Sequence, residues 1–148
     1  MTLSSQDAQP VPQGNYSPAS RHGDLIFTAG MTPRRGGVLI SLGKVSADLP
    51  PQAYREAVVQ ACRNALGAAR AMLGPEEDLY CILSMTVFIA AEDGYSKHSQ
   101  VADLASDFLQ DEFGERGRCS RCAVGVATLP GNAPVEIQLV AAARKDLF

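Results

Sequence analysis

Residues 121–138 constrain the fold most, because they form two apolar β segments joined by a turn and carry two charges. The first segment opens with Arg121, the second has Glu136 near its start, and residues 130–132 (Pro-Gly-Asn) supply the turn signal. A charge buried without a partner costs several kcal/mol. We therefore expect each charge to meet a partner, a ligand or a water-filled pocket, which makes Arg121 and Glu136 the first candidates for chemistry.

Hydrophobic patterning predicts strands and helices along the rest of the chain. Strands are expected at residues 25–31, 38–45, 80–90, 121–128 and 135–143, after a short extended segment at 14–20. Helices are expected at residues 50–74 and 95–113, with inward stripes made of Tyr54, Val58, Ala61, Ala65, Ala68 and Met72, and of Val101, Leu104, Ala105 and Phe108. This order predicts an α+β fold, a mixed sheet with two helices packed on one face.

Length and charge exclude several classes of protein. The 148 residues fit one domain, expected at residues 14–148 after a flexible arm at 1–13. A net charge of −3 and the lack of a basic stripe argue against nucleic acid as a partner. No apolar run approaches the roughly 20 residues that span a bilayer. The polar start is no secretory signal. A cytoplasmic location without membrane contact is the resulting expectation.

The four cysteines, Cys62, Cys81, Cys119 and Cys122, are expected to be free thiols in such a compartment. Cys119 and Cys122 match C-x-x-C, which leaves redox or metal use open. However, this pair enters a predicted strand, where an odd spacing sends the two side chains to opposite faces. We favour coincidence and expect no metal site.

The uncovered face of the sheet predicts an oligomer. One side of strand 121–128 carries Arg121, Ala123, Gly125 and Ala127, and the other carries Cys122, Val124, Val126 and Thr128. Both sets consist mostly of apolar or small residues whose exposure to solvent is unfavourable, so we expect the open sheet faces of several subunits to pack together. The small residues on the first side predict the close approach of another subunit. Gly125→Glu is then expected to abolish assembly and ligand binding together.

Three segments resemble the RidA/YjgF family, also called the endoribonuclease L-PSP or imine deaminase family. Residues 14–19 (GNYSPA) and 23–33 (GDLIFTAGMTP) are similar to its opening and first-strand motifs. The third match is R-x-x-V-x-V-x-x-L-P from Arg121, followed by V-E-I at residues 135–137. The resemblance covers residues 14–143, and the longer loop at 113–118 is similar to the less characterised branch.

The resemblance implies a chorismate-mutase-like fold assembled as a homotrimer, with pockets between subunits and no metal or organic cofactor. It implies that Arg121 binds a substrate carboxylate, that Glu136 positions a water and that Tyr16 lines the pocket. Backbone groups of Gly30 and Ala123 are implied to contact the ligand. The implied reaction is hydrolysis of a small 2-imino or enamine acid to a 2-keto acid and ammonia.

Several positions depart from the family pattern. Ala29 replaces a pocket serine, Gln138 replaces a second glutamate, and Asp103 is the nearest counterpart of an asparagine on the second helix. A non-catalytic module that binds a small carboxylate therefore stays open beside the deaminase, and an endoribonuclease is less favoured. Structural roles also stay open: an inter-subunit ion pair for Arg121, a structural carboxylate for Glu136 and core packing for Tyr16.

Overall fold

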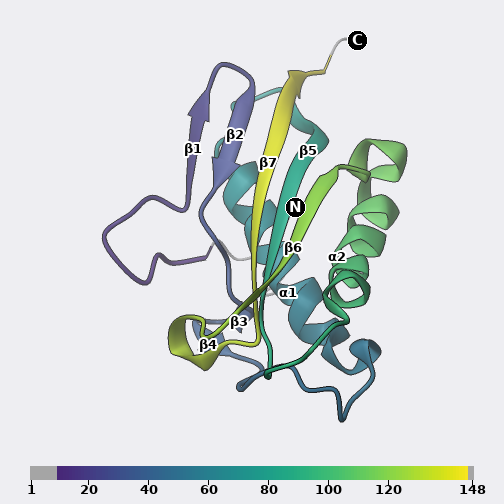
Figure 1. Cartoon of the computed structure of the whole chain (residues 1–148). Coiled ribbons are helices and arrows are strands. Elements are labelled where there is room, and N and C mark those ends of the chain that lie inside the picture. Colours follow the sequence, from purple (N-terminus) through teal and green to yellow (C-terminus); the bar gives the residue numbers. More distant parts are fainter. Residues whose placement is uncertain (1–9, 147–148) are drawn as a thin grey trace.

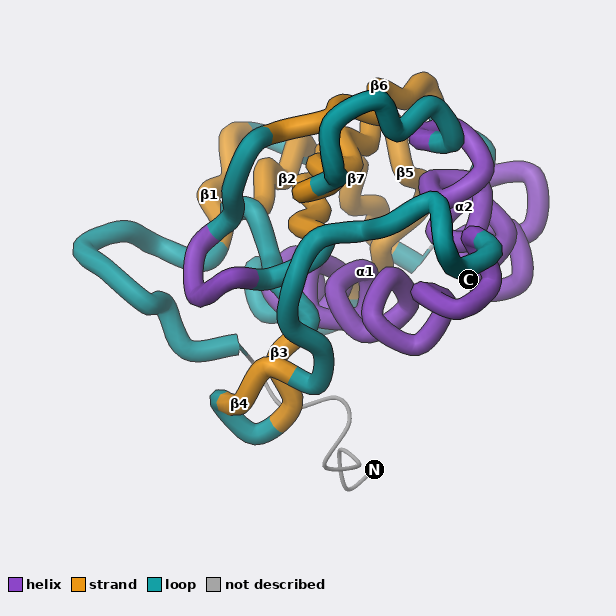
Figure 2. Tube along the Cα trace, turned by 60° about the horizontal axis from the view of Figure 1, so that its bottom comes forward, coloured by secondary structure: helices purple, strands orange, loops and turns teal. Residues whose placement is uncertain are grey.

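The computed structural model describes residues 10–146, and its centre is a five-stranded mixed sheet. Figure 1 shows the strand order β1-β2-β7-β5-β6, and Figure 2 shows both long helices on one side of the strands. The strands are β1 (Ala19–His22), β2 (Leu25–Thr28), β5 (Glu77–Ala90), β6 (Ser120–Val126) and β7 (Val135–Lys145). β6 runs parallel to β5, and the other pairings are antiparallel. The predicted α+β architecture is confirmed.

Both helices bury the stripes expected from the sequence. A 3-10 turn, η1 (Pro51–Tyr54), leads into α1 (Arg55–Arg70), and α2 (His98–Phe113) is followed by η2 (Gly114–Gly117). The expected inward residues are buried, except Met72, which packs at the edge of the core. Because its buried side is rich in alanine, α1 can lie close against the sheet. Gly114 ends α2 with a φ of 63°, a conformation that favours glycine.

The prediction of a strand at residues 38–45 is wrong for most of that segment. Only β4 (Val38–Leu39) is a strand, paired with β3 (Arg34–Arg35) in a small hairpin apart from the main sheet (Figure 2). Gly43 has a φ of 95°, which ends the extended conformation there. Val45 returns to make a single bridge to Ala91.

The two β segments that carry Arg121 and Glu136 are not neighbours in the sheet. After β6 the chain turns through η3 (Pro130–Asn132) and crosses the end of β5, so β5 separates β6 from β7 (Figure 1). Met85 of β5 lies beside both Arg121 and Leu139, whereas Phe88 lies beside Glu136. Side chains alternate along a strand, so Arg121 shares the helix-covered face with Leu139 and Glu136 lies on the opposite face.

The face of the sheet without helices carries a mixed but largely apolar surface. Its residues include Leu25, Phe27, Phe88, Cys122 and Val124. Two of the small residues on the other side of β6 contact their own chain. Ala123 packs against the core, and a Cβ added to Gly125 would lie 2.5 Å from Nε2 of His98 in α2. The His98 side chain thus lies beside Gly125, but Gly125 and Ala127 are themselves exposed, so the trimer and the effect of Gly125→Glu stay predictions.

The N-terminal arm is described only from residue 10 onward; residues 1–9 of the predicted arm lie outside the described residues. Pro10 lies beside Gly67 of α1, so this end of the arm contacts the helix.

All four cysteines are free, with Cys119 on the helix side and Cys122 exposed on the open face, as the odd spacing predicted. Among residues 10–146, neither helix has the length and apolarity of a membrane span.

Candidate functional site

Glu136 is a half-buried carboxylate without a partner in the described chain. It lies on the open face of β7, and its Cδ is 2.8 Å from the point where a Cβ on Gly30 would stand. Only glycine therefore fits at position 30 without moving this carboxyl group. No hydrogen bond or ion pair of Glu136 occurs within residues 10–146. Burial raises the pKa of the Glu136 carboxyl above its usual range.

A bulge between β2 and β7 places Gly30 beside Glu136. Phe27 pairs with Val140, and the next bridge joins Met31 to Ile137, so β2 has one more residue than β7 across this interval. The buried hydroxyl of Thr28 accepts a 3.0 Å hydrogen bond from the Leu139 N–H and takes the place of a backbone acceptor. Ala29, the position of the family serine, lies in this bulge and donates its N–H to Pro18 O at 2.8 Å.

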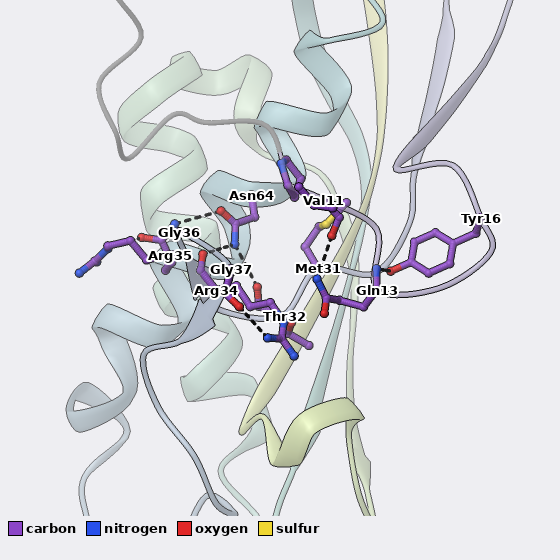
Figure 3. A pocket seen from close by; sticks show the side chains of 13 residues that line it. Val11, Gln13, Tyr16, Met31, Thr32, Arg34, Arg35, Gly36, Gly37 and Asn64 are labelled. Atoms are coloured by element: carbon purple, nitrogen blue, oxygen red, sulfur yellow. Dashed lines mark hydrogen bonds between the residues drawn. The ribbon is translucent and has the colours of Figure 1, made fainter.

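Gly30 also borders a cavity of about 240 Å³ between the N-terminal segment, the β3–β4 hairpin and α1 (Figure 3). Tyr16 lines it at the outer edge, and its hydroxyl accepts a 3.2 Å hydrogen bond from the Gln13 N–H. Tyr16 is 48% exposed, so it lies at the lip of the cavity and not in the core. Of the predicted site residues, Gly30 lies beside Glu136 and also borders the cavity that Tyr16 lines, but Glu136 is not among the residues that line this cavity.

Two buried amides of α1 hold the inner wall of this cavity. The Asn64 amide nitrogen donates to Thr32 O and Arg34 O, at 3.0 and 2.8 Å, and its oxygen accepts from Gln60 Nε2 at 3.0 Å (Figure 3). Gln60 in turn accepts from Arg35 Nε at 3.1 Å. Sequence reasoning missed this pair. Its signal was two amides spaced i, i+4 on the alanine-rich side of the helix.

Arg121 has four hydrogen bonds to α2 of its own chain. Its Nη1 donates to Asp103 Oδ1 at 2.8 Å and to Ser106 Oγ at 2.9 Å. Its Nη2 donates to Oγ and O of Ser99, at 2.9 and 3.2 Å. A guanidinium has five N–H groups, so only the Nε–H remains without an acceptor among the described residues. Ser99, Asp103 and Ser106 lie on one side of α2 because of their i, i+4, i+7 spacing.

A second cavity, of about 260 Å³, opens beside this network. It is lined by Asp103, Ser106, Gln110, Arg118, Cys119 and Arg121. The exposed guanidinium of Arg118 makes no ion pair within residues 10–146. Arg118 is therefore a second cation next to Arg121, and an anion entering this cavity would meet both.

The structure does not bring Arg121 and Glu136 together within one subunit. Arg121 and Ala123 face α2, whereas Glu136 and Gly30 lie on the other side of the sheet, with β5 between the two strands. The pocket implied by the resemblance lies between subunits, so its sharing by Arg121 and Glu136 stays a prediction. A site that uses both residues has to combine two subunits. No group of three His, Cys, Asp or Glu side chains that would hold a metal ion occurs in the described part.

Comparison with known proteins identifies relatives over nearly the whole chain. Residues 6–143 match the family model described as Endoribonuclease L-PSP. Protein TCP17 of Trypanosoma cruzi is 31% identical over 133 residues, covering 88% of this chain and 82% of that protein. The solved structure of Atu1372 from Agrobacterium tumefaciens is 28% identical, with a TM-score of 0.82 over 92% of this chain and 86% of the other.

The structure of E. coli TdcF with bound serine shares the fold, with a TM-score of 0.62 and 21% identity. The likeness covers 93% of this chain and 94% of TdcF. The fold implied by the sequence resemblance is therefore confirmed.

Proposed function

Because this chain belongs to the endoribonuclease L-PSP family, we propose that it is a hydrolytic deaminase of small reactive 2-imino or enamine carboxylic acids. The proposed site lies between subunits, with Arg121 from one chain and Glu136, Gly30 and Tyr16 from its neighbour. The reaction needs no cofactor in this proposal, since an imine carbon is already electrophilic. A small carboxylic acid is the proposed ligand, in line with the serine bound to TdcF.

The unpartnered carboxyl group of Glu136 is the observation that carries this proposal. A half-buried carboxyl costs free energy unless it meets a ligand, a water or another chain. Burial raises the pKa of the Glu136 carboxyl, which makes its carboxylate a stronger base toward a bound water. A purely structural carboxylate would be expected to have a hydrogen-bond donor, and none is present within residues 10–146.

The proposed steps balance with water as the second reactant. A water held by Glu136 attacks the imine carbon while the carboxylate takes one of its protons. The resulting carbinolamine receives that proton on nitrogen. The carboxylate then moves the hydroxyl proton to the nitrogen as the C=O bond forms and the C–N bond breaks, and the products are a 2-keto acid and ammonia. Arg121 binds the substrate carboxylate and fixes the imine carbon relative to the water, which supplies proximity.

The test is the release of ammonia and keto acid from a freshly generated enamine acid, measured for wild type, Arg121→Ala and Glu136→Gln. We expect wild type to accelerate the release and Glu136→Gln to lose roughly 10²–10⁴-fold, the usual contribution of a general acid–base group. Equal rates in the three proteins would refute the proposal. Circular dichroism of each variant controls for folding.

A second candidate is a module that binds a small carboxylate without turnover. It is favoured by the four hydrogen bonds that hold Arg121 against α2, and by Ala29 and Gln138 at the positions of the family's serine and second glutamate. Ala29→Ser separates the two candidates. A gain in turnover would indicate a weakened enzyme, and unchanged binding without turnover would favour the module.

A further inference from the structure

The guanidinium of Arg121 is already occupied at both of its terminal nitrogens. Each terminal nitrogen donates two hydrogen bonds, and the four acceptor atoms belong to Ser99, Asp103 and Ser106. A ligand carboxylate binds a guanidinium best through two parallel N–H bonds. Such a ligand therefore has to displace at least one acceptor of the same chain before it can bind Arg121 in this way.

Asp103 is the acceptor that a ligand displaces at the least cost. Its side chain is 58% exposed, against 19% for Arg121, so the released carboxylate is readily solvated. It is also the only charged acceptor of the four, and it presents to Arg121 the same chemical group as the proposed ligand. The ion pair is open to the cavity that Arg118 and Cys119 also line, so an incoming anion has a route to it.

We propose that Asp103 is an internal competitor for the carboxylate site of Arg121 and sets its selectivity. This inference depends on the proposed function, in which Arg121 binds the ligand carboxylate. In the ligand-free chain Asp103 neutralises the charge of Arg121, so carboxylates that make few other contacts with the site bind poorly. A ligand binds when its own carboxylate makes better contacts than Asp103, including contacts with Arg118 in the same cavity.

The size of the effect follows from the geometry of the pair. A partly exposed ion pair contributes little to stability, because solvent screens it and one side chain is mobile. Removing Asp103 should therefore tighten carboxylate binding by about two- to fivefold, the equilibrium ratio that corresponds to the usual contribution of an exposed ion pair. If Asp103 instead only orients Arg121, the same change should weaken binding.

The experiment measures the dissociation constant of 2-oxobutyrate by calorimetry for wild type, Asp103→Ala and Asp103→Asn. Asp107→Ala is the matched control, since this exposed carboxylate lies one turn further along α2 and has no partner within residues 10–146. The neutral amide of 2-oxobutyrate serves as the control ligand. We expect tighter 2-oxobutyrate binding in Asp103→Ala, an intermediate effect in Asp103→Asn, little change in Asp107→Ala, and no gain for the amide.

The outcomes separate this inference from the proposed function. If wild type binds 2-oxobutyrate, Arg121→Ala loses binding, and Asp103→Ala binds equally or more weakly, the competitor role is overturned while the carboxylate site stands. An equal gain in Asp107→Ala would also overturn it, because the effect would then come from overall charge. Binding that Arg121→Ala leaves unchanged, or no binding in any variant, overturns the proposed function together with this inference.

Discussion

Replacement of Asn64 by alanine should destabilise the fold by an amount that the structure sets. The side chain is 6% exposed and makes three hydrogen bonds, to Thr32 O, Arg34 O and Gln60 Nε2. Each bond contributes about 0.5–1.5 kcal/mol net, and a buried group left without its partner costs about 1–3 kcal/mol. Because Gln60 is only 3% exposed, its amide has little access to water after the change. We expect a loss of about 2–4 kcal/mol in the free energy of unfolding.

Urea unfolding followed by far-UV circular dichroism measures this loss, at one fixed protein concentration because assembly would affect the midpoint. Asn15→Ala is the control, since Asn15 is exposed and should stay within about 0.5 kcal/mol of wild type. Asn64→Asp keeps the shape but turns an oxygen toward two carbonyl oxygens, so it should destabilise at least as much as alanine. A loss in Asn64→Ala no larger than in the control would refute the assignment of these bonds.

Two further predictions concern ion pairing and close packing. Glu77 accepts from both terminal nitrogens of Arg21 and from the Gly74 N–H, and the bond from Arg21 lowers its pKa from 4.5 to about 2. The pKa of Glu77 is lower in the folded than in the unfolded state, so the stabilisation from its ionised form is complete above about pH 5 and is lost as pH falls toward 2. Glu77→Gln should therefore flatten the melting temperature as a function of pH between about 2 and 5. Parallel profiles of wild type and variant would contradict this. Gly117→Ala places a Cβ against the backbone carbonyl of Leu109 and should cost about 1–3 kcal/mol, whereas Gly125→Ala displaces only the His98 ring and should cost about 0.5–1 kcal/mol. Thermal unfolding of the two variants gives the order, and the reverse order would show that these contacts are misassigned.

The fold was predictable because its signals are local. Periodicity located both helices and four of the five predicted strands, and Gly114 marked the end of α2. The segment at 38–45, predicted as an exposed strand broken by Gly43, failed because its ladder partner β3 has only two residues, so the pairing stops at Leu39.

The candidate site was less predictable, because it depends on register. The sequence showed that Arg121 and Glu136 needed partners, but it did not show that β5 would separate their strands. Once Met85 pairs with Arg121 and Phe88 with Glu136, the two charges lie on opposite faces. Asp103 was visible only as a poor match to an asparagine, and its role as the partner of Arg121 required the packing of α2 against β6.

The position of β7 has a consequence for how this chain folds during synthesis. β7 is the middle strand of the sheet, paired with β2 on one side and β5 on the other, yet it follows every other strand in the sequence (Figure 1). While β7 is still in the ribosome, β1–β2 and β5–β6 are separate pieces without a common sheet. Long-range pairings of this kind slow folding and leave strand edges exposed in the meantime. The edges of β2 and β5 that β7 covers are therefore open to non-native pairing until β7 has been made.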